Sequence, residues 1–324
     1  MPTAKRALPA TLVRRGGDRL LFDCGEGTQR QLLRSDLGLV ELEEVFLTHF
    51  HADHYLGLPG MLKTFALRGR EIPLTLYGPA GLKSLVATLA RVFGRLTYPV
   101  TVVELEPGEE VERDGYRIAT FAVEHGVTAL GYALVEEARP GRFDVETATR
   151  LGVPDGRERG LLQRGESVTL ADGRVVTPQD VLGGAREGRK VVLAGDTAPA
   201  ASVVDAASGA DLLVHEATFL ADELERARET SHSTAGGAAL VAQEAGVKLL
   251  ALTHVSTRYF GHQVVEEAAQ LFEATVVPRD FDLVTIPFPE RGGPELVRSG
   301  ARAAQPERTN SILVEPTSPS VSSS

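Results

Sequence analysis

The chain has 324 residues, 43% of them hydrophobic, and a formal net charge of −10 at pH 7. This size suffices for one large or two small domains with a substantial core. No stretch approaches the roughly 18 apolar residues of a membrane span, and the N-terminus lacks a signal-peptide core, so we expect a cytoplasmic protein outside the membrane. The single cysteine, Cys24, fits a reducing compartment. The negative net charge excludes a generally basic protein that binds nucleic acids over its whole surface. Any contact with nucleic acid therefore requires a local basic surface.

Short strand-like runs alternate with helical patterns along most of the chain, which predicts an α/β architecture. Strands are expected at 19–23, 44–48, 74–77, 117–123, 131–136, 190–194, 211–214, 248–253 and 283–286. Apolar residues near helical spacing predict helices at 28–34, 57–66, 81–92, 234–245 and 263–272.

Two segments depart from this alternation. Residues 138–187 lose the core strands and gain Gly, Pro and Arg, with one short helical pattern at 144–151, so we expect an arm inserted into a body that spans 1–298. Residues 299–324 are rich in Ser, Pro, Ala and Glu, which predicts a disordered tail.

Residues 49–54, His-Phe-His-Ala-Asp-His, place three imidazoles and one carboxylate directly after an apolar strand-like run. A mixed nitrogen and oxygen set suits Zn²⁺, and less well Mn²⁺ or Fe²⁺, whereas Ca²⁺ and Mg²⁺ prefer oxygen alone. His49 and His51 alternate as on an extended segment, while Asp53 and His54 are adjacent and must diverge. One stretch can therefore supply two ions. The alternative is a solvated surface tract, but a Gly- and Pro-containing turn follows at once, as after a buried strand.

Three more ligand-type residues, His125, Asp196 and His254, each follow an apolar strand-like run. In α/β scaffolds functional groups lie at the carboxyl ends of strands. Each residue alone could be an ordinary polar strand end. With the first cluster they complete a set for two metals, because a carboxylate can bridge two cations.

Glu216 follows a strand-like run, and His232 precedes the helix expected from about Thr234. One interpretation is that Ser233 or Thr234 caps this helix and His232 is simply exposed. The functional interpretation pairs Glu216 with His232, because a carboxylate would orient the imidazole and raise its pKa. The imidazole could then protonate a leaving alkoxide.

These residues and their surroundings resemble the ribonuclease Z family of the metallo-β-lactamase superfamily. The matching motifs are Phe22-Asp23-Cys24-Gly25-Glu26-Gly27-Thr28-Gln29-Arg30-Gln31, residues 48–54 with Gly57-Leu58-Pro59-Gly60, Gly195-Asp196-Thr197, His215-Glu216-Ala217-Thr218-Phe219, Ser231-His232-Ser233-Thr234, and His254 with Arg258-Tyr259. The resemblance runs from about residue 1 to residue 289. It implies a four-layer αββα sandwich with a protruding arm and with metals at one edge between the sheets.

The resemblance also implies two Zn²⁺ ions and their ligands. His49, His51 and His125 would hold one ion, Asp53, His54 and His254 the other, and Asp196 would bridge them. Asp53 would in addition accept a proton from the attacking water, and Glu216 and His232 would assist the leaving group.

The implied activity is a zinc-dependent endoribonuclease that removes the 3′ trailer from precursor tRNA, leaving a 3′-hydroxyl on the tRNA and a 5′-phosphate on the trailer. Between Ala138 and Lys190 the chain carries ten cations against eight anions, so this segment is the best candidate for phosphate contact, although part of it could be an ordinary solvated loop. The candidate contacts are Arg142, Arg157, Arg159 and Arg164. The family grips tRNA with such an arm and forms homodimers, so we expect both here.

Two competing functions remain open from the sequence. The first is another superfamily hydrolase that cuts a small phosphodiester, ester or lactam with the same metals. The second is a non-catalytic RNA-binding relative. The motif at 23–31 and the arm count against the first, and the complete set of ligand types counts against the second.

Overall fold

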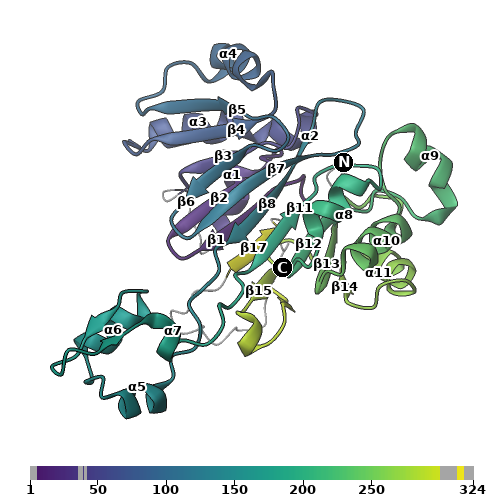
Figure 1. Ribbon diagram of the computed structural model, residues 1–324. Helices are drawn as coiled ribbons and strands as arrows, with labels where there is room; N and C mark the ends of the chain where they lie inside the picture. The colour runs from purple at the N-terminus through teal and green to yellow at the C-terminus, as the bar shows by residue number, and fades with distance from the viewer. Residues whose placement is uncertain (1–5, 36–38, 40–41, 300–311, 317–324) are drawn as a thin grey trace, which may run out of the picture.

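The computed structural model describes residues 6–35, 39, 42–299 and 312–316. Two β-sheets lie face to face, and helices cover both outer faces (Figure 1). The first sheet, in spatial order, contains β16 (Glu295–Val297), β15 (Leu283–Ile286), β17 (Ile312–Pro316), β1 (Thr11–Arg15), β2 (Asp18–Phe22), β3 (Glu44–Phe46), β4 (Leu74–Gly78) and β5 (Val100–Glu104). The second contains β14 (Thr275–Val276), β13 (Leu249–Thr253), β12 (Leu212–Glu216), β11 (Lys190–Leu193), β8 (Leu130–Glu136), β7 (Tyr116–Ala122) and β6 (Glu110–Arg113).

Helices pack on the outer face of each sheet. The helices of the first half are α1 (Thr28–Arg34), α2 (Ala52–Tyr55), α3 (Gly57–Leu67) and α4 (Leu82–Phe93). The second half contains α8 (Ala201–Ala207), η1 (Ala221–Glu223), α9 (Leu224–Glu229), α10 (Ala235–Ala245), α11 (Gly261–Ala269) and η2 (Pro289–Arg291). No helix in the described ranges is long and apolar enough to cross a bilayer.

Alternation along the strands divides the core into three layers of side chains. In β2, Leu20 and Phe22 point into the space between the sheets, whereas Leu21 joins the cluster under the first-half helices. In β12, Leu212 faces the space between the sheets and Leu213 faces the second-half helices. This period of two is what a strand buried on both faces requires. The predicted αββα sandwich is confirmed.

The arm extends away from the body, at the lower left of Figure 1. It contains α5 (Val145–Leu151), α6 (Arg157–Gln163), β9 (Val168–Thr169), β10 (Val175–Val176) and α7 (Pro178–Val181). Its small apolar core is separate from those of the body and consists of Ala148, Val153, Leu162, Val168, Leu170, Val176 and Val181. The sequence predicted only the first helix, which Asp144 caps by accepting a hydrogen bond from the Thr147 N–H (2.9 Å).

The base of the arm is tied to the body through Glu290 in η2. Arg139 donates to both carboxylate oxygens of Glu290 (2.8 and 2.9 Å), and Arg186 donates to one of them (2.9 Å). The backbones of Arg139 and Arg186 also pair with each other. The Arg139 guanidinium lies 3.6 Å from the centre of the Phe288 ring. Both ends of the inserted segment therefore meet one point on the body.

The tail differs in part from the predicted disorder. Residues Ile312–Pro316 form β17, which pairs antiparallel with β1 on one side and β15 on the other. Backbone pairing on two sides supplies hydrogen bonds that composition alone does not reveal. The expectation was wrong for these five residues. Residues 300–311 and 317–324 lie outside the described residues.

Candidate active site and metal centre

Side chains from both sheets meet at the edge where the parallel strands end. The first sheet contributes Asp23 after β2 and the segment 48–54 after β3. The second contributes His125 beyond β7, Asp196 beyond β11, Glu216 at the end of β12 and His254 directly after β13. All seven predicted metal ligands belong to clusters of potential donor atoms that lie within 4.8 Å of one another. Their role as ligands stays a prediction, but the fold brings them together.

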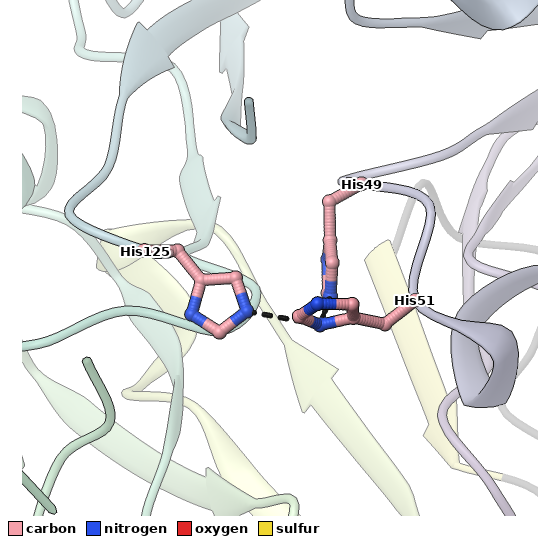
Figure 2. Close-up of side chains that lie close together, drawn as sticks. All are labelled: His49, His51 and His125. Carbon is pink, nitrogen blue, oxygen red and sulfur yellow. Dashed lines mark hydrogen bonds between the residues drawn. The ribbon is translucent and has the colours of Figure 1, made fainter. Parts of the chain in front are cut away.

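The first cluster consists of three imidazoles, His49, His51 and His125 (Figure 2). His51 Nδ1 lies 2.9 Å from His49 Nε2 and 3.1 Å from His125 Nε2. The three rings come from two separate loops and present one nitrogen each to the same point. Burial is the main cause that lowers the pKa of His49 to about 2, so this ring is neutral at physiological pH.

Hydrogen bonds behind these rings leave the inward nitrogens without protons. His125 Nδ1 donates to the Ser231 carbonyl (3.1 Å), and His49 Nδ1 lies 3.0 Å from the Thr48 hydroxyl, which itself donates to Asp23. The tautomers are inferred from these partners. The Nε2 atoms of both rings therefore carry lone pairs that face His51. A cation satisfies three such nitrogens at once, as Zn²⁺ does with imidazole ligands.

The second cluster consists of Asp53, His54 and His254, with Asp196 beside it. Asp196 Oδ2 lies 3.3 Å from His54 Nε2, 3.4 Å from His254 Nε2 and 4.0 Å from His49 Nε2 of the first cluster. Burial opposes the charge on Asp196, but His254 and His54 hold its pKa well below the usual range. A carboxylate that faces both clusters is placed to bridge two cations.

Asp23 supports both clusters from behind, a role that the sequence analysis did not assign. Its carboxylate accepts from His54 Nδ1 (2.8 Å) and from the Thr48 N–H (2.8 Å). His54 therefore presents Nε2 to Asp196, as a metal-binding histidine does when a carboxylate holds its other nitrogen. Asp23 is only 5% exposed and has φ +60°, a left-handed conformation that is uncommon for residues other than glycine. Its place after β2 in the 22–31 motif was the one available signal.

Glu216 and His232 form a close pair beside the clusters. His232 Nδ1 donates to Glu216 Oε1 at 2.5 Å, and Glu216 is 1% exposed. Burial opposes the charged imidazole, but Glu216 raises the pKa of His232 above its usual value. The alternative interpretation is correct for the cap, because the Thr234 hydroxyl accepts from the Gly237 N–H (3.0 Å) at the start of α10, but His232 is only 16% exposed. The cap fixes the helix, and His232 turns toward the site.

Comparisons with known proteins agree with this geometry. The family model of the metallo-β-lactamase superfamily matches residues 7–254. The ribonuclease Z of Myxococcus xanthus is 52% identical over 259 residues, which cover 80% of this chain and 84% of that protein. The ribonuclease Z of Methanosarcina acetivorans is 43% identical over 291 residues, covering 89% and 95%. The chain belongs to the ribonuclease Z family.

Solved structures support the same assignment. The crystal structure of the short form of human tRNase Z matches with a TM-score of 0.61 at 25% identity, covering 86% of this chain and 92% of that one. The family resemblance and the enzyme class predicted from the sequence, a phosphodiester-hydrolysing endoribonuclease of the ribonuclease Z type, are confirmed. Membership of the metallo-β-lactamase superfamily implies metal binding, and the His and Asp clusters provide suitable donors.

The four arginines predicted to contact substrate belong to the arm, which Figure 1 shows extending away from the body of this ribonuclease Z family member. Arg142 and Arg157 are exposed and make no ion pair within the described ranges. Arg164 is exposed and lies 3.5 Å from Glu166. Arg159 instead donates to the Val153 carbonyl and pairs with Asp155 (2.6 Å). Three of the four are thus open to a ligand, whereas Arg159 also serves the internal structure of the arm.

Proposed function

We propose that this chain is a zinc-dependent endoribonuclease that removes the 3′ trailer from precursor tRNA. The products would be a tRNA with a 3′-hydroxyl and a trailer with a 5′-phosphate. The observation that carries the proposal is the convergence of seven ligand-type side chains at the strand ends, next to the Glu216–His232 pair, in a chain of the ribonuclease Z family.

Two Zn²⁺ ions fit the donor set better than any other common metal. One cluster offers three imidazoles, the other two imidazoles and a carboxylate, and Asp196 lies between them. When bound, a zinc pair supplies hydroxide at neutral pH and stabilises the charge that develops on the phosphate and the leaving oxygen. The proposed holders are His49, His51 and His125 for one ion, Asp53, His54 and His254 for the other, and Asp196 for both.

Asp53 is proposed to accept the proton of the attacking water. Its side chain is 33% exposed, whereas those of Asp196 and His54 are at most 4% exposed. It is therefore the carboxylate of the site that an incoming water can reach. His254, whose Nε2 lies 3.4 Å from Asp53 Oδ2, holds the Asp53 pKa below its usual range, which keeps the side chain ionised.

His232 is proposed to deliver a proton to the departing 3′ oxygen. Its Nδ1 is occupied by Glu216, so Nε2 is the nitrogen that can carry the transferred proton. The His232 ring stacks on His254, with centroids 5.5 Å apart, so it lies beside the second cluster. The negative charge of Glu216 stabilises the protonated ring before transfer.

The arm is proposed to bind tRNA through backbone phosphates at a distance from the cut. Exposed Arg142, Arg157 and Arg164 suit such contacts, because phosphate contacts position RNA without reading its bases. This would allow one enzyme to accept many tRNAs. We further propose a homodimer in which the arm of one subunit serves the site of the other, and a cytoplasmic location.

The direct test is an assay of the purified protein on two precursor tRNAs, one with and one without an encoded CCA. We expect endonucleolytic cleavage at the 3′ end of the tRNA body. Ligation of an adaptor should detect a free 3′-hydroxyl, and digestion by a 5′-phosphate-dependent exonuclease should detect the trailer end. Cleavage of a small chromogenic phosphodiester without cleavage of either precursor would reject the tRNA substrate. A 2′,3′-cyclic phosphate product would reject attack by water.

A further inference from the structure

Thr218 lies two residues after Glu216 and contacts two parts of the site that have separate proposed tasks. Its hydroxyl oxygen is 2.6 Å from Glu216 Oε2 and 2.8 Å from His254 Nδ1. Its backbone N–H also donates to Glu216 Oε2 (3.1 Å). One side chain therefore touches a proposed metal ligand and the carboxylate that holds His232.

The single proton of the hydroxyl decides the direction of these bonds. An ionised carboxylate can only accept, so the Thr218 hydroxyl donates its proton to Glu216. The hydroxyl oxygen must then accept a hydrogen bond from His254, which places the hydrogen on Nδ1 of that ring. In the neutral ring, His254 Nε2 then carries the lone pair, and it faces Asp53 and Asp196 at 3.4 Å each. That is the tautomer a metal ligand needs.

The same bond completes the surroundings of Glu216. Its Oε1 accepts from His232 Nδ1 and from the Thr197 N–H (3.1 Å), and its Oε2 accepts both bonds from Thr218. At 1% exposure, water cannot readily replace a lost donor. Without the hydroxyl, the carboxylate can turn, and its bond to His232 loses its fixed direction.

We propose that Thr218 is a positioning residue that couples the proton donor to the second metal position, by fixing the His254 tautomer and the Glu216 carboxylate with one hydroxyl. This inference rests on the proposed pair of zinc ions. It goes further by assigning to one side chain the joint control of metal affinity and leaving-group protonation.

A second threonine has the same arrangement in the other half of the site. The Thr48 hydroxyl lies 3.0 Å from His49 Nδ1 and donates to the Asp23 carboxylate at 3.0 to 3.1 Å. Thr48 follows β3 of the first sheet, and Thr218 follows β12 of the second. The imidazole, hydroxyl and buried carboxylate thus recur in the same order at two strand ends. This recurrence supports a role in orienting ligands rather than in local packing alone.

The test uses Thr218→Val, which keeps the shape of the side chain and removes the hydroxyl, and Thr218→Ser, which keeps the hydroxyl. Thr120→Val is the matched control, since Thr120 is buried and its hydroxyl donates only to the backbone carbonyls of Glu106 and Glu109. Zinc affinity is measured by competition with a chromophoric chelator. Thr218→Val should bind one of two ions roughly 10- to 100-fold more weakly. Thr218→Ser and Thr120→Val should keep both affinities.

A second readout follows the proton donor with both metal positions saturated by added zinc. Thr218→Val should then cleave precursor tRNA more slowly than wild type. It should recover on a precursor whose leaving 3′ oxygen is replaced by sulfur, which departs without protonation. Thr218→Ala tests the same loss if the valine variant does not fold.

Unchanged affinity for both ions in Thr218→Val, or an equal loss in Thr218→Ser, would overturn the coupling. These outcomes can be distinguished from a failure of the proposed function itself. Wild-type protein that binds fewer than two zinc ions would refute the zinc pair and remove the basis of this inference with it.

Discussion

The metal site and the arm use polar side chains in opposite ways. At the site, His49, His54, Asp196 and Glu216 are at most 4% exposed, and each is oriented by neighbouring groups. On the arm, Arg142 and Arg157 project into solvent without an ion pair in the described part of the chain. Catalysis requires side chains that are held in fixed orientations, which burial and several hydrogen bonds to each side chain provide. Recognition of a long, charged ligand requires accessible charge.

The difference also predicts opposite responses to salt. As the salt concentration rises, interactions between exposed cationic side chains and phosphate are screened, and the release of counterions contributes less to binding. The hydrogen bonds around Asp23 and Glu216 are buried and are screened much less. Raising the salt concentration should therefore weaken tRNA binding well before it alters hydrolysis of a small substrate. The five variants below test this separation.

The largest effect is expected for Asp196→Ala, which removes the carboxylate between the two clusters. It should lose both zinc ions and with them all detectable cleavage, because Asp196 faces His49 on one side and His54 with His254 on the other. Metal content per chain, by atomic emission, is the measurement. Asp205→Ala, an exposed carboxylate in α8, is the control and should retain both. Two zinc ions per chain in the Asp196 variant would contradict the bridging role.

The next effect concerns the proton donor. His232→Ala should keep zinc content and tRNA affinity but lower the cleavage rate by roughly 10² to 10⁴, the range for a positioned acid or base. A precursor with sulfur at the leaving position should restore much of this rate. His262→Ala replaces an exposed histidine at the start of α11 and should have no effect. An equal defect on both precursors would place His232 in phosphate binding instead.

Removal of the arm should affect binding rather than chemistry. In the variant, a short Gly-Ser linker replaces residues 142–184. The two ends of this segment already lie side by side, because the Gly183 N–H donates to the Arg142 carbonyl (3.0 Å). We expect weaker binding of precursor tRNA and a shallower dependence of affinity on salt, by about 0.7 to 0.9 in log–log slope per lost phosphate contact. Hydrolysis of a small phosphodiester should be largely retained. If both substrates suffer equally, the arm belongs to the catalytic body.

Much of the site was predictable because its residues follow apolar strands. Asp196 and His254 each stand at the end of a hydrophobic run, and the parallel strands bring such ends to one edge. The orienting roles of Thr48 and Thr218 were not predictable. A threonine near a strand end is common in sequence, and only the positions of imidazole and carboxylate reveal its two bonds.

The errors in the fold have equally local causes. The strand β1 was not predicted, because Thr11–Arg15 ends in two arginines and lacks a long apolar run. The helices α6 and α7 were missed in the arm because they are short and separated by glycine and polar residues. The strand β17 depends on pairing with β1 and β15, which are about 300 and 30 residues away in the chain. Long-range pairing of this kind leaves little trace in local composition.

The smallest effects are expected for Arg157→Ala and Arg159→Ala, which separate binding from structure within the arm itself. Arg157 is exposed, so its loss should leave the arm intact. The salt dependence of tRNA binding should become shallower by the contribution of about one phosphate contact. Arg159 bonds the Val153 carbonyl and the Thr149 hydroxyl (2.9 Å), so its loss should destabilise the arm by about 1 to 2 kcal/mol.

Hydrogen exchange of the amides in α5 and α6 distinguishes these outcomes. Protection should fall in Arg159→Ala and stay unchanged in Arg157→Ala, whereas the body should behave like wild type in both. The exposed ion pair of Arg159 with Asp155 should add little to this difference, since the Asp155 side chain is 88% exposed. Equal protection in the two variants would show that Arg159, like Arg157, is available to the RNA. Lower affinity for tRNA in Arg159→Ala without lost protection would lead to the same conclusion.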